Sequence, residues 1–316
     1  MTSKTETHLS IVIPVLDEEK NIPELYGKIV NALHGLGESS YEIIFIDDGS
    51  TDDTLGMLER LHTEDSSVKI VKFRTNLGKA AAYSVGFMKA QGDIVITMDG
   101  DLQDDPTEIG KFLDKIEEGY DVVTGWKHRG KGPMAKKLPS KFFNRVVSIV
   151  TGLKLHDFNC PFKAYRHHVL KNLRIYGELY RFIPVLLYTK GYRIAEIKVE
   201  NHPRKYGRSK YGCGRFMRGF LDLITVVFIT QYDQSPLYLF GYAGTLLFAV
   251  GFLIDAILTF QGLFITGRVG HTALLLLGIL LMILGVQLFA TGLLGDLVIS
   301  RQRQDLDSYA IEKTVE

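Results

Sequence analysis

The sequence predicts an α/β domain with a mostly parallel sheet, followed by two apolar helices that are each long enough to cross a membrane. Three observations lead to this prediction. Short β-branched runs alternate with helical patterns over residues 9–125, acidic clusters follow two of these runs, and uncharged stretches occupy residues 236–254 and 272–295 of the 316-residue chain. Alternating strands and helices are typical of a parallel sheet that is covered on both faces.

The predicted strands are rich in Ile and Val and lie at residues 9–16, 41–47, 68–73, 93–99 and 121–126. The helical patterns between them cover residues 21–36, 52–63, 79–90 and 107–118. In such sheets ligands bind beyond the carboxyl ends of the strands, where the acidic clusters 47–53 and 99–105 lie. The loop after the first strand, residues 14–21, contains no glycine, which excludes a Gly-x-Gly-x-x-Gly dinucleotide site.

Charge is distributed unevenly, although the formal net charge is only +1. Residues 122–156 contain no acid but eight Lys or Arg residues, and residues 201–221 contain no acid but six. Such segments indicate a polyanion, a phosphate or a membrane surface as partner. A solvated basic face is the plain alternative.

The two uncharged stretches match the length that a helix needs to cross a hydrocarbon core of roughly 30 Å. A buried hairpin of a soluble protein is the alternative, and two such runs in sequence are rare there. One arginine lies between the stretches, whereas basic segments precede them and Arg301 and Arg303 follow. This asymmetry predicts a multi-pass protein of the cell (inner) membrane with both termini and the α/β domain in the cytoplasm.

Two further segments mix basic and bulky apolar residues at near-helical spacing. They are residues 136–155 and 215–233, and we expect them to be amphipathic helices at the bilayer interface. Ordinary core-facing helices are the alternative. The expected organisation is a cytoplasmic domain at 1–205, an interfacial region at 206–234, spans at about 236–260 and 272–298 within 235–300, and a cytoplasmic tail at 301–316.

The two cysteines and the first residues of the chain indicate the cellular compartment in which the protein works. Cys160 and Cys213 match no metal or redox motif, so a reducing compartment is the simplest expectation. The first eight residues are polar and a short apolar run follows them, which predicts no signal peptide.

Glycines recur every seven residues in the second stretch, at Gly278, Gly285 and Gly292. They form one smooth stripe on a helix, and small residues let helix backbones approach closely, so we expect a homo-oligomer through this span. Packing against the first span of the same chain is the alternative. Asp255 is a charge at membrane depth and is expected to face protein or water rather than lipid.

The acidic cluster at residues 99–105 predicts a cation site. Asp99 and Asp101 are one residue apart at a strand end, so both can reach one hard divalent ion, with an amide oxygen added by Gln103. Four aspartates within seven positions repel one another, and we expect a cation to compensate them. The alternative is a turn that caps a helix, a role expected here for Asp104 or Asp105 before a proline.

Several motifs resemble those of a known family in order and spacing. IPVLDEEKNI, IDDGSTDDT, NLGKAAAYSVGFMKAQGD and DGDLQ are similar to the nucleotide-sugar domain of family 2 glycosyltransferases, which implies a GT-A type fold. The later DFNCPFKAYR and RKYGRSKYG, with the two apolar stretches, resemble the polyprenyl-phosphate branch. That branch includes bactoprenol glucosyltransferases, dolichol-phosphate mannose synthases and undecaprenyl-phosphate aminoarabinose transferases. The resemblance covers roughly residues 8–300.

The resemblance implies a donor site. The residues that it places at the nucleotide sugar are Pro14, Leu16, Glu18, Asp48, Asn76, Gly78, Lys79 and Asp99. The first three match the segment that lines the base and ribose pocket, and Asp48 matches the aspartate that pairs with the base. The positions implied for the metal are Asp99, Asp101 and Gln103, where Mg²⁺ or Mn²⁺ would offset the charge that develops on the departing diphosphate.

The resemblance also implies a lipid acceptor, a polyprenyl phosphate that stays in the bilayer. The residues expected against its phosphate are Arg129, Arg204, Ser209 and Lys210. The residues expected to be catalytic are Asp157, Asp101 and Arg204, and a loop anchor is the plain alternative for Asp157. His156 and His202 are assigned no role.

The implied reaction is an in-line displacement at the anomeric carbon with inversion. A phosphate monoester has its second pKa near about 6, so the acceptor is already an anion and needs positioning more than deprotonation. Trp126 is the only tryptophan and no Gln-x-x-Arg-Trp motif surrounds it, which predicts one transfer per cycle.

We expect a UDP-sugar, with glucose as the sugar, and undecaprenyl phosphate as substrates. The alternatives are a GDP-mannose-dependent enzyme of the same kind and a catalytically inactive membrane scaffold. The expected partners are the nucleotide sugar, the lipid, the membrane, a second copy of the chain and a flippase, and no nucleic acid.

Overall fold

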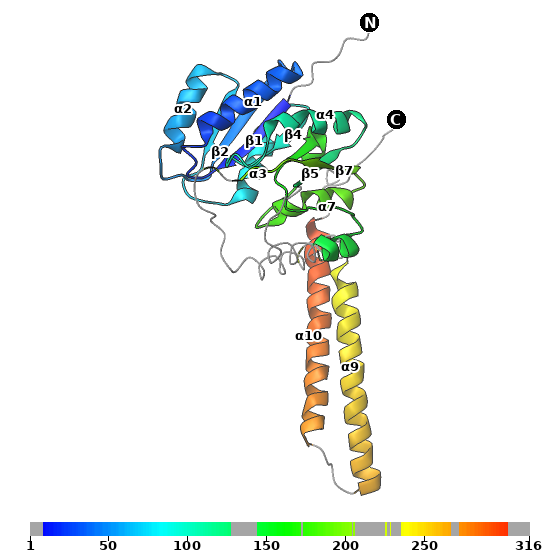
Figure 1. The fold of residues 1–316 in the computed structure, drawn as a ribbon. Coiled ribbons are helices and arrows are strands. Elements are labelled where there is room, and N and C mark those ends of the chain that lie inside the picture. Colours follow the sequence, from blue (N-terminus) through cyan, green and yellow to red (C-terminus); the bar gives the residue numbers. More distant parts are fainter. Residues whose placement is uncertain are drawn as a thin grey trace. The chain divides into compact units, whose positions relative to one another are not determined.

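The computed structural model describes residues 9–127, 144–171, 173–203, 235–266 and 272–302, together with Lys205, Thr225 and Phe228. The chain divides into two compact units, Met1–Val226 and Val227–Glu316. The first unit contains the sheet and the helices around it, and the second contains two long helices (Figure 1).

The first unit is built on a mixed sheet of seven strands in the order β3-β2-β1-β4-β6-β5-β7. The strands are β1 (Leu9–Val15), β2 (Tyr41–Asp47), β3 (Val68–Lys72), β4 (Ile94–Thr97), β5 (Val122–Lys127), β6 (Lys163–Arg166) and β7 (Ile194–Val199). β1 is parallel to both β2 and β4, β2 is parallel to β3, and β5 is parallel to β7. The five strands predicted from the apolar runs are confirmed.

Strand β6 makes the sheet mixed, because it is antiparallel to both of its neighbours, β4 and β5. It has four residues and lies in the segment DFNCPFKAYR, whose apolar residues show no clear period. In the sheet, β6 lies between β4 and β5. In an uninterrupted parallel sheet, β4 and β5 would be neighbours. A short strand without alternation gives no sequence signal, so β6 was not predicted.

Four helices of the first unit follow the predicted pattern. They are α1 (Ile22–Leu36), α2 (Thr54–Glu64), α3 (Lys79–Lys89) and α4 (Ile109–Glu117), the last preceded by the 3₁₀ turn η1 (Pro106–Glu108). The shorter elements near the end of the unit are α6 (His167–Leu170), η2 (Leu179–Phe182) and α7 (Ile183–Tyr188).

The core lies on both faces of the sheet. In β1 the residues at positions 9, 11, 13 and 15 pack in one cluster with the buried faces of α1 and α4. Val12 points the other way and lies against Gly86 of α3, where an added Cβ would meet its side chain. Successive strand residues face opposite sides of a sheet, so strands that are buried on both faces must be apolar throughout. This explains the unbroken apolar runs in the sequence.

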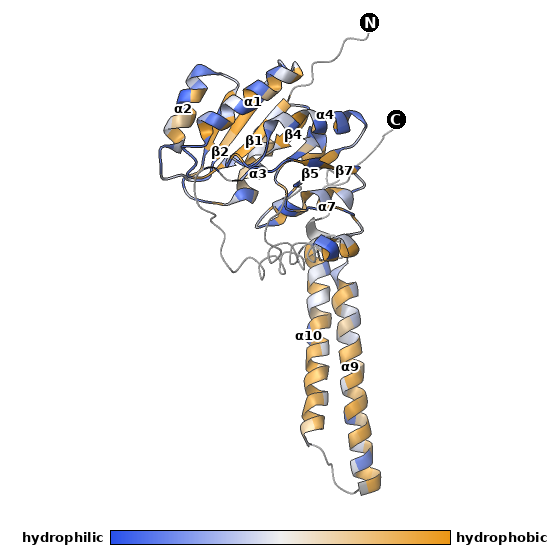
Figure 2. Ribbon diagram, viewed as in Figure 1, coloured by the Kyte–Doolittle hydropathy of each residue, from blue (hydrophilic) through white to orange (hydrophobic). Residues whose placement is uncertain are grey.

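The second unit is a hairpin of α9 (Pro236–Gln261), continued by the π-helical η3 (Gly262–Thr266), and α10 (Thr272–Gln302). The segments Pro236–Ile265 and Thr272–Val298 are long and apolar enough to cross a membrane. Hydrophobic residues make up most of both helices (Figure 2). Asp296 of α10 accepts a hydrogen bond at 3.2 Å from the backbone N–H of Leu237, one of the unpaired donors at the start of α9.

The glycine stripe of α10 packs against α9 of the same chain. A Cβ at Gly285 would lie 2.6 Å from the carbonyl oxygen of Gly244, and one at Gly292 would lie 3.1 Å from the Cα of Leu237. Gly278 faces the carboxylate of Asp255, whose Oδ1 is buried without a hydrogen-bond partner among the described residues. The glycine stripe therefore packs within the hairpin, which was the alternative to packing between two copies of the chain. It no longer supports the expected homo-oligomer.

The two expected interfacial segments are described to different extents. In the first, residues 144–151 are helical, whereas residues 136–143 are not described. Val147 is fully buried in this helix and Ile149 is 70% exposed. In the second, only Thr225 and Phe228 are described, so both interfacial helices stay predictions.

We predict that Gly285→Leu destabilises the hairpin. The new side chain would collide with the backbone of α9 around Gly244, and overpacking of this kind costs about 1–3 kcal/mol. Thermal unfolding in detergent, followed by helical circular dichroism, measures the loss. Ala243→Leu is the matched control, because Ala243 is exposed beside Gly244. Equal unfolding temperatures for the two variants would contradict the packing described above.

Candidate active site

The carboxyl ends of β1, β2 and β4 bring three loops to one edge of the sheet. Val15 at the end of β1 is in register with Asp47 at the end of β2, and on its other side β1 pairs with β4 as far as Thr97. The loops that follow contain Leu16 and Glu18, Asp48, and the acidic cluster 99–105, while Pro14 lies within β1 itself. The structure therefore brings together the segments expected to form the donor site.

The loops after β1 and β2 are joined by reciprocal hydrogen bonds. The backbone N–H of Asp17 donates to Ser50 Oγ at 2.9 Å, and Thr51 N–H donates back to Asp17 Oδ1 at 2.8 Å. The N–H of Glu18 donates to Thr54 Oγ1 at 2.9 Å. Asp17 has a φ of 48°, a left-handed conformation that is uncommon for residues other than glycine. These bonds fix the loop that contains Leu16 and Glu18.

Asp48 connects the second loop to the one before α3. Its side chain is buried, and Oδ1 accepts from the N–H of Leu77 at 2.7 Å while Oδ2 accepts from the N–H of Gly78 at 3.0 Å. Gly78 has a φ of 88°, which favours glycine. Gly49 also must be glycine, because a Cβ there would lie 2.7 Å from the backbone of Thr75. The expected loop 76–79 thus lies beside Asp48, whose carboxylate already binds backbone groups.

The aspartates of the cluster have cationic or backbone partners. Lys79 Nζ lies 2.6 Å from Asp99 Oδ1, and the N–H of Gln103 donates to Asp101 Oδ1 at 3.2 Å. Burial alone would raise the pKa of the Asp99 carboxyl, but Lys79 and then Lys127 hold it below its ordinary value. Lys79 thus offsets part of the charge of the cluster, whereas burial, together with the neighbouring Asp99, raises the pKa of the Asp104 carboxyl above its ordinary value. The cation expected to compensate the aspartates stays a prediction.

Asp104 is the most buried member of the cluster. Its Oδ1 lies 2.7 Å from Lys127 Nζ at the end of β5, and its Oδ2 accepts from the backbone N–H of Asp99 at 3.2 Å. Burial opposes the charge on Lys127, but Asp104 raises the pKa of that ammonium above its ordinary value. The ion pair thus ties the Asp99 backbone to β5. The long sequence separation of these residues left no signal by which the pair could have been predicted.

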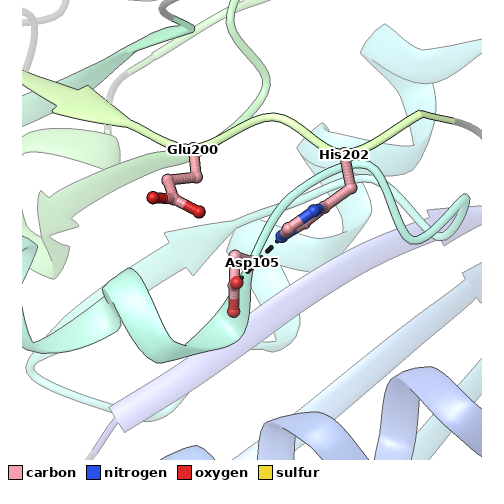
Figure 3. A group of neighbouring side chains, drawn as sticks. All are labelled: Asp105, Glu200 and His202. Carbon is pink, nitrogen blue, oxygen red and sulfur yellow. Dashed lines mark hydrogen bonds and ion pairs between the residues drawn. The ribbon is translucent and has the colours of Figure 1, made fainter.

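Asp105, Glu200 and His202 place three ligand-type atoms within 4.8 Å of one another (Figure 3). His202 Nε2 lies 2.9 Å from Asp105 Oδ2, and Asp105 Oδ1 accepts from Thr107 N–H at 3.0 Å, so the predicted helix cap at Asp105 is confirmed. The backbone N–H of His202 donates to the carbonyl of Gln103 at 2.9 Å. A His–carboxylate set of this kind suits Mn²⁺ or a later transition metal better than Mg²⁺. A lone histidine carries no spacing signal, so no role was predicted for His202 from the sequence.

Asp157 follows the helical residues 144–151 and lies in a fixed loop. Its Oδ1 accepts from the N–H of Asn159 at 2.9 Å, and its own N–H donates to Glu196 of β7 at 3.0 Å. The buried Lys163 of β6 lies nearby, and burial holds the pKa of its ammonium below the ordinary value despite the acidic neighbours. The expected residues Arg129, Arg204, Ser209 and Lys210 lie outside the described residues.

The geometry agrees with a family assignment from sequence. A family model described as glycosyl transferase family 2 matches residues 10–174, which contain β1 to β6 and the three loops. The chain belongs to glycosyl transferase family 2. It is 35% identical over 295 residues to a dodecaprenyl-phosphate galacturonate synthase of Rhizobium johnstonii, covering 92% of this chain and 87% of the relative.

A second relative transfers another sugar. The chain is 36% identical over 313 residues to an undecaprenyl-phosphate 4-deoxy-4-formamido-L-arabinose transferase of Proteus mirabilis, covering 97% of this chain and 94% of the relative. The relatives of this family 2 chain are thus polyprenyl-phosphate glycosyltransferases, and the resemblance read from the motifs is confirmed.

The fold is confirmed by solved structures. A crystal structure of glucosyl-3-phosphoglycerate synthase from Mycobacterium tuberculosis, in complex with Mn²⁺, UDP and phosphoglyceric acid, matches with a TM-score of 0.55 at 19% identity. The match covers 71% of this chain and 78% of that chain. The first unit of this family 2 protein therefore has a GT-A-like fold.

The donor atoms at the sheet edge fit a divalent cation. Asp101 is 4% exposed and offers a carboxylate, and Gln103 beside it offers an amide oxygen, both of which are hard ligands. Asp99 shares its carboxylate with Lys79 and would be the weakest of the three expected ligands.

We predict that Lys79→Met lowers the free energy of unfolding by about 2 kcal/mol at neutral pH, the contribution of a hydrogen bond between charged groups. Because the folded pKa of Asp99 is depressed, this contribution is present above the ordinary value of 3.8 and is lost as pH falls through the folded value. The difference between wild type and variant should therefore shrink in acid. Urea unfolding followed by Trp126 fluorescence measures it.

Lys115→Met is the control for this experiment. Lys115 pairs with Glu118 on the surface, where the two side chains are 35% and 51% exposed, so the loss should be much smaller than for Lys79→Met. If the free energy of unfolding of the wild type exceeds that of Lys79→Met by the same amount in acid as at neutral pH, the Asp99–Lys79 contact is contradicted.

Proposed function

We propose that this protein transfers one sugar from a UDP-sugar to the phosphate of a membrane polyprenyl phosphate, with inversion, and that glucose is the sugar. The observation that carries the proposal is that the three loops after β1, β2 and β4 meet at one sheet edge. The proposal is also supported by relatives that align with almost the whole chain and are named for sugar transfer to polyprenyl phosphates. Undecaprenyl phosphate is the proposed acceptor.

The donor would lie along these loops. Pro14, Leu16 and Glu18 would line the base and ribose, with Asp48 and the loop of Asn76 and Gly78 beside them. Asp48 binds the backbone of residues 77 and 78, so we assign it the additional task of fixing this loop before the nucleotide binds. Lys79 would neutralise Asp99 and so limit repulsion between the aspartates and the diphosphate.

Asp101 and Gln103, with Asp99, would hold an Mg²⁺ or Mn²⁺ ion. When bound, the ion supplies Lewis-acid stabilisation of the negative charge on the leaving diphosphate. The residues of the chain position the partners. Asp157 would orient the basic groups of the acceptor side, and the acceptor phosphate, already an anion, would be bound by Arg129, Arg204, Ser209 and Lys210. The planar fork of Arg204 suits phosphate oxygens.

The hairpin would anchor the enzyme in the cell membrane with both termini and the first unit in the cytoplasm, so the enzyme would stay on the membrane that contains its lipid substrate. Residues 206–234 would lie at the interface, and residues 301–316 would form a cytoplasmic tail. A second copy of the chain and a flippase stay further proposed partners, and the glycine stripe no longer supports the first of them.

Labelled nucleotide sugars test the proposal. Membranes that contain the protein are incubated with UDP-glucose, UDP-galacturonate, UDP-4-deoxy-4-formamido-L-arabinose or GDP-mannose in turn, and undecaprenyl phosphate is extracted. Label in the lipid from UDP-glucose alone is the expected result. If the lipid is labelled from another UDP-sugar, that sugar replaces glucose in the proposal. If the lipid is labelled from GDP-mannose alone, the enzyme uses the alternative donor. No labelled lipid from any donor overturns the transferase and favours the inactive scaffold.

We predict that the transfer requires a divalent cation and that Asp101→Ala lowers its rate by more than about 100-fold. Lewis-acid stabilisation of a leaving group contributes several kcal/mol, and each 1.36 kcal/mol is about tenfold in rate. Asp114→Ala, at an exposed position of α4, is the control and should keep full activity. Circular dichroism confirms that both variants fold. Full turnover in excess chelator would show that no cation takes part.

A further inference from the structure

We propose that Glu196 is the positioning residue that fixes Asp157 for the transfer reaction, an inference that rests on the proposed function. Glu196 lies in β7, in register with Thr124 of β5, and its side chain is only 11% exposed. A carboxylate at such a position needs strong partners, because burial of an uncompensated charge is costly. Among the described residues, its hydrogen-bond partners are His156 and Asp157.

Two consecutive backbone N–H groups donate to this carboxylate. The N–H of His156 lies 2.8 Å from Oε1 and the N–H of Asp157 lies 3.0 Å from the same oxygen. The ring Nδ1 of His156 lies 2.6 Å from Oε2, and it must carry the proton in this contact because a carboxylate only accepts. One side chain of β7 thus binds two backbone N–H groups, at His156 and Asp157, and the imidazole ring of His156.

The same loop is held from its other side. Asn144 Nδ2 donates to the carbonyl of His156 at 2.6 Å, and Ser148 Oγ donates to the carbonyl of Leu155 at 3.4 Å. The peptide group between His156 and Asp157 is therefore bound at its oxygen by Asn144 and at its nitrogen by Glu196. The side chain of Asp157 is fixed in turn by the N–H of Asn159. Together these contacts leave Asp157 little freedom of position.

The imidazole of His156 also stacks on Trp126 of β5, with ring centroids 4.1 Å apart and planes 15° apart. Lys198 lies over the same indole, 5.1 Å from its centroid. Trp126 and Lys198 are in register, two residues along from the pair of Thr124 and Glu196, so all four share one face of the sheet. The contact of Glu196 with His156 consequently lies next to the only tryptophan of the protein, which reports on it by fluorescence.

A purely structural role is the competing explanation, and kinetics separate the two. Displacement of a reacting group by about 1 Å can cost about 100-fold in rate, while the binding of a substrate that the group does not touch is unaffected. A positioning residue therefore lowers kcat and leaves the KM of the donor nucleotide unchanged. A residue that only stabilises the fold lowers the amount of active protein and alters neither constant per folded molecule.

The test is Glu196→Gln, which keeps the size of the side chain and removes one acceptor oxygen and the charge. We expect kcat to fall by about 10- to 100-fold, with the donor KM within about twofold of wild type. Hydrogen exchange of the peptide that contains His156 and Asp157 should accelerate by about tenfold, since a charge-assisted hydrogen bond is weakened. Trp126 emission should change, because His156 loses its ionised partner.

Glu42→Gln is the matched control. Glu42 of β2 is also a buried carboxylate that binds a backbone N–H, that of Gln91 at 2.6 Å, together with Ser10 and Lys69. It lies in register with Ser10 near the amino ends of the strands, the opposite edge from the candidate site. This variant should lose stability and keep both kcat and KM.

The outcomes are distinct. Faster exchange with an unchanged kcat would overturn the positioning role, and unchanged exchange in Glu196→Gln would overturn the contact itself. A fall in kcat of the same size in Glu42→Gln would also overturn the positioning role, because the effect would then be structural. Absence of transfer by the wild type overturns the proposed function and the role of Glu196 in it, and hydrogen exchange would still measure the contact.

Discussion

Four aspartates within seven positions fold at one sheet edge, where side chains from distant parts of the chain contact Asp99, Asp104 and Asp105. Lys79 comes from the start of α3, Lys127 from the end of β5 and His202 from the segment after β7. Each contact also ties a loop to another element, so the charges that would disrupt the edge instead hold it in one arrangement. These contacts offset part of the charge of the cluster, and the proposed metal ion would act on the charge that arises in the reaction. Asp101 is buried at the same edge, and its Oδ1 accepts a hydrogen bond from the N–H of Gln103.

The sequence predicted the elements whose signal is local. Apolar runs identified β1 to β5, and helical periodicity identified α1 to α4, because these patterns arise within 4 to 15 residues. The antiparallel β6 escaped prediction, since its four residues show no alternation and its place between β4 and β5 depends on contacts distant in sequence. For the same reason Lys127 was counted with the basic residues that face a phosphate or membrane, whereas the structure pairs it with the buried Asp104.

Both histidines that the sequence left without a role contact carboxylates near the site. A single histidine in a sequence carries no periodicity and no spacing rule, so its partner is known only once the strands are placed. His202 reaches Asp105 because the segment after β7 runs beside the turn at Gln103, and His156 reaches Glu196 because β7 pairs with β5. The aspartate motifs were recognisable in the sequence because their members are neighbours in the chain. The residues that support them were not, because the fold brings them there.

The hydrogen bonds and ion pairs of the candidate site do not determine which sugar is transferred. The hydrogen bonds described at Asp17, Asp48 and Asp99 join loops and side chains of the protein to one another, and they would be equally useful to any nucleotide sugar. Two relatives that share 35% and 36% of their aligned residues with this chain are named for different sugars, galacturonate and 4-deoxy-4-formamido-L-arabinose. Discrimination between sugars requires polar groups that match individual ring substituents, since a buried group left unpaired by the wrong sugar costs binding energy. Such groups must come from side chains that vary on the same backbone, so motif matching identifies the reaction class and a comparison of donors is needed to identify the sugar.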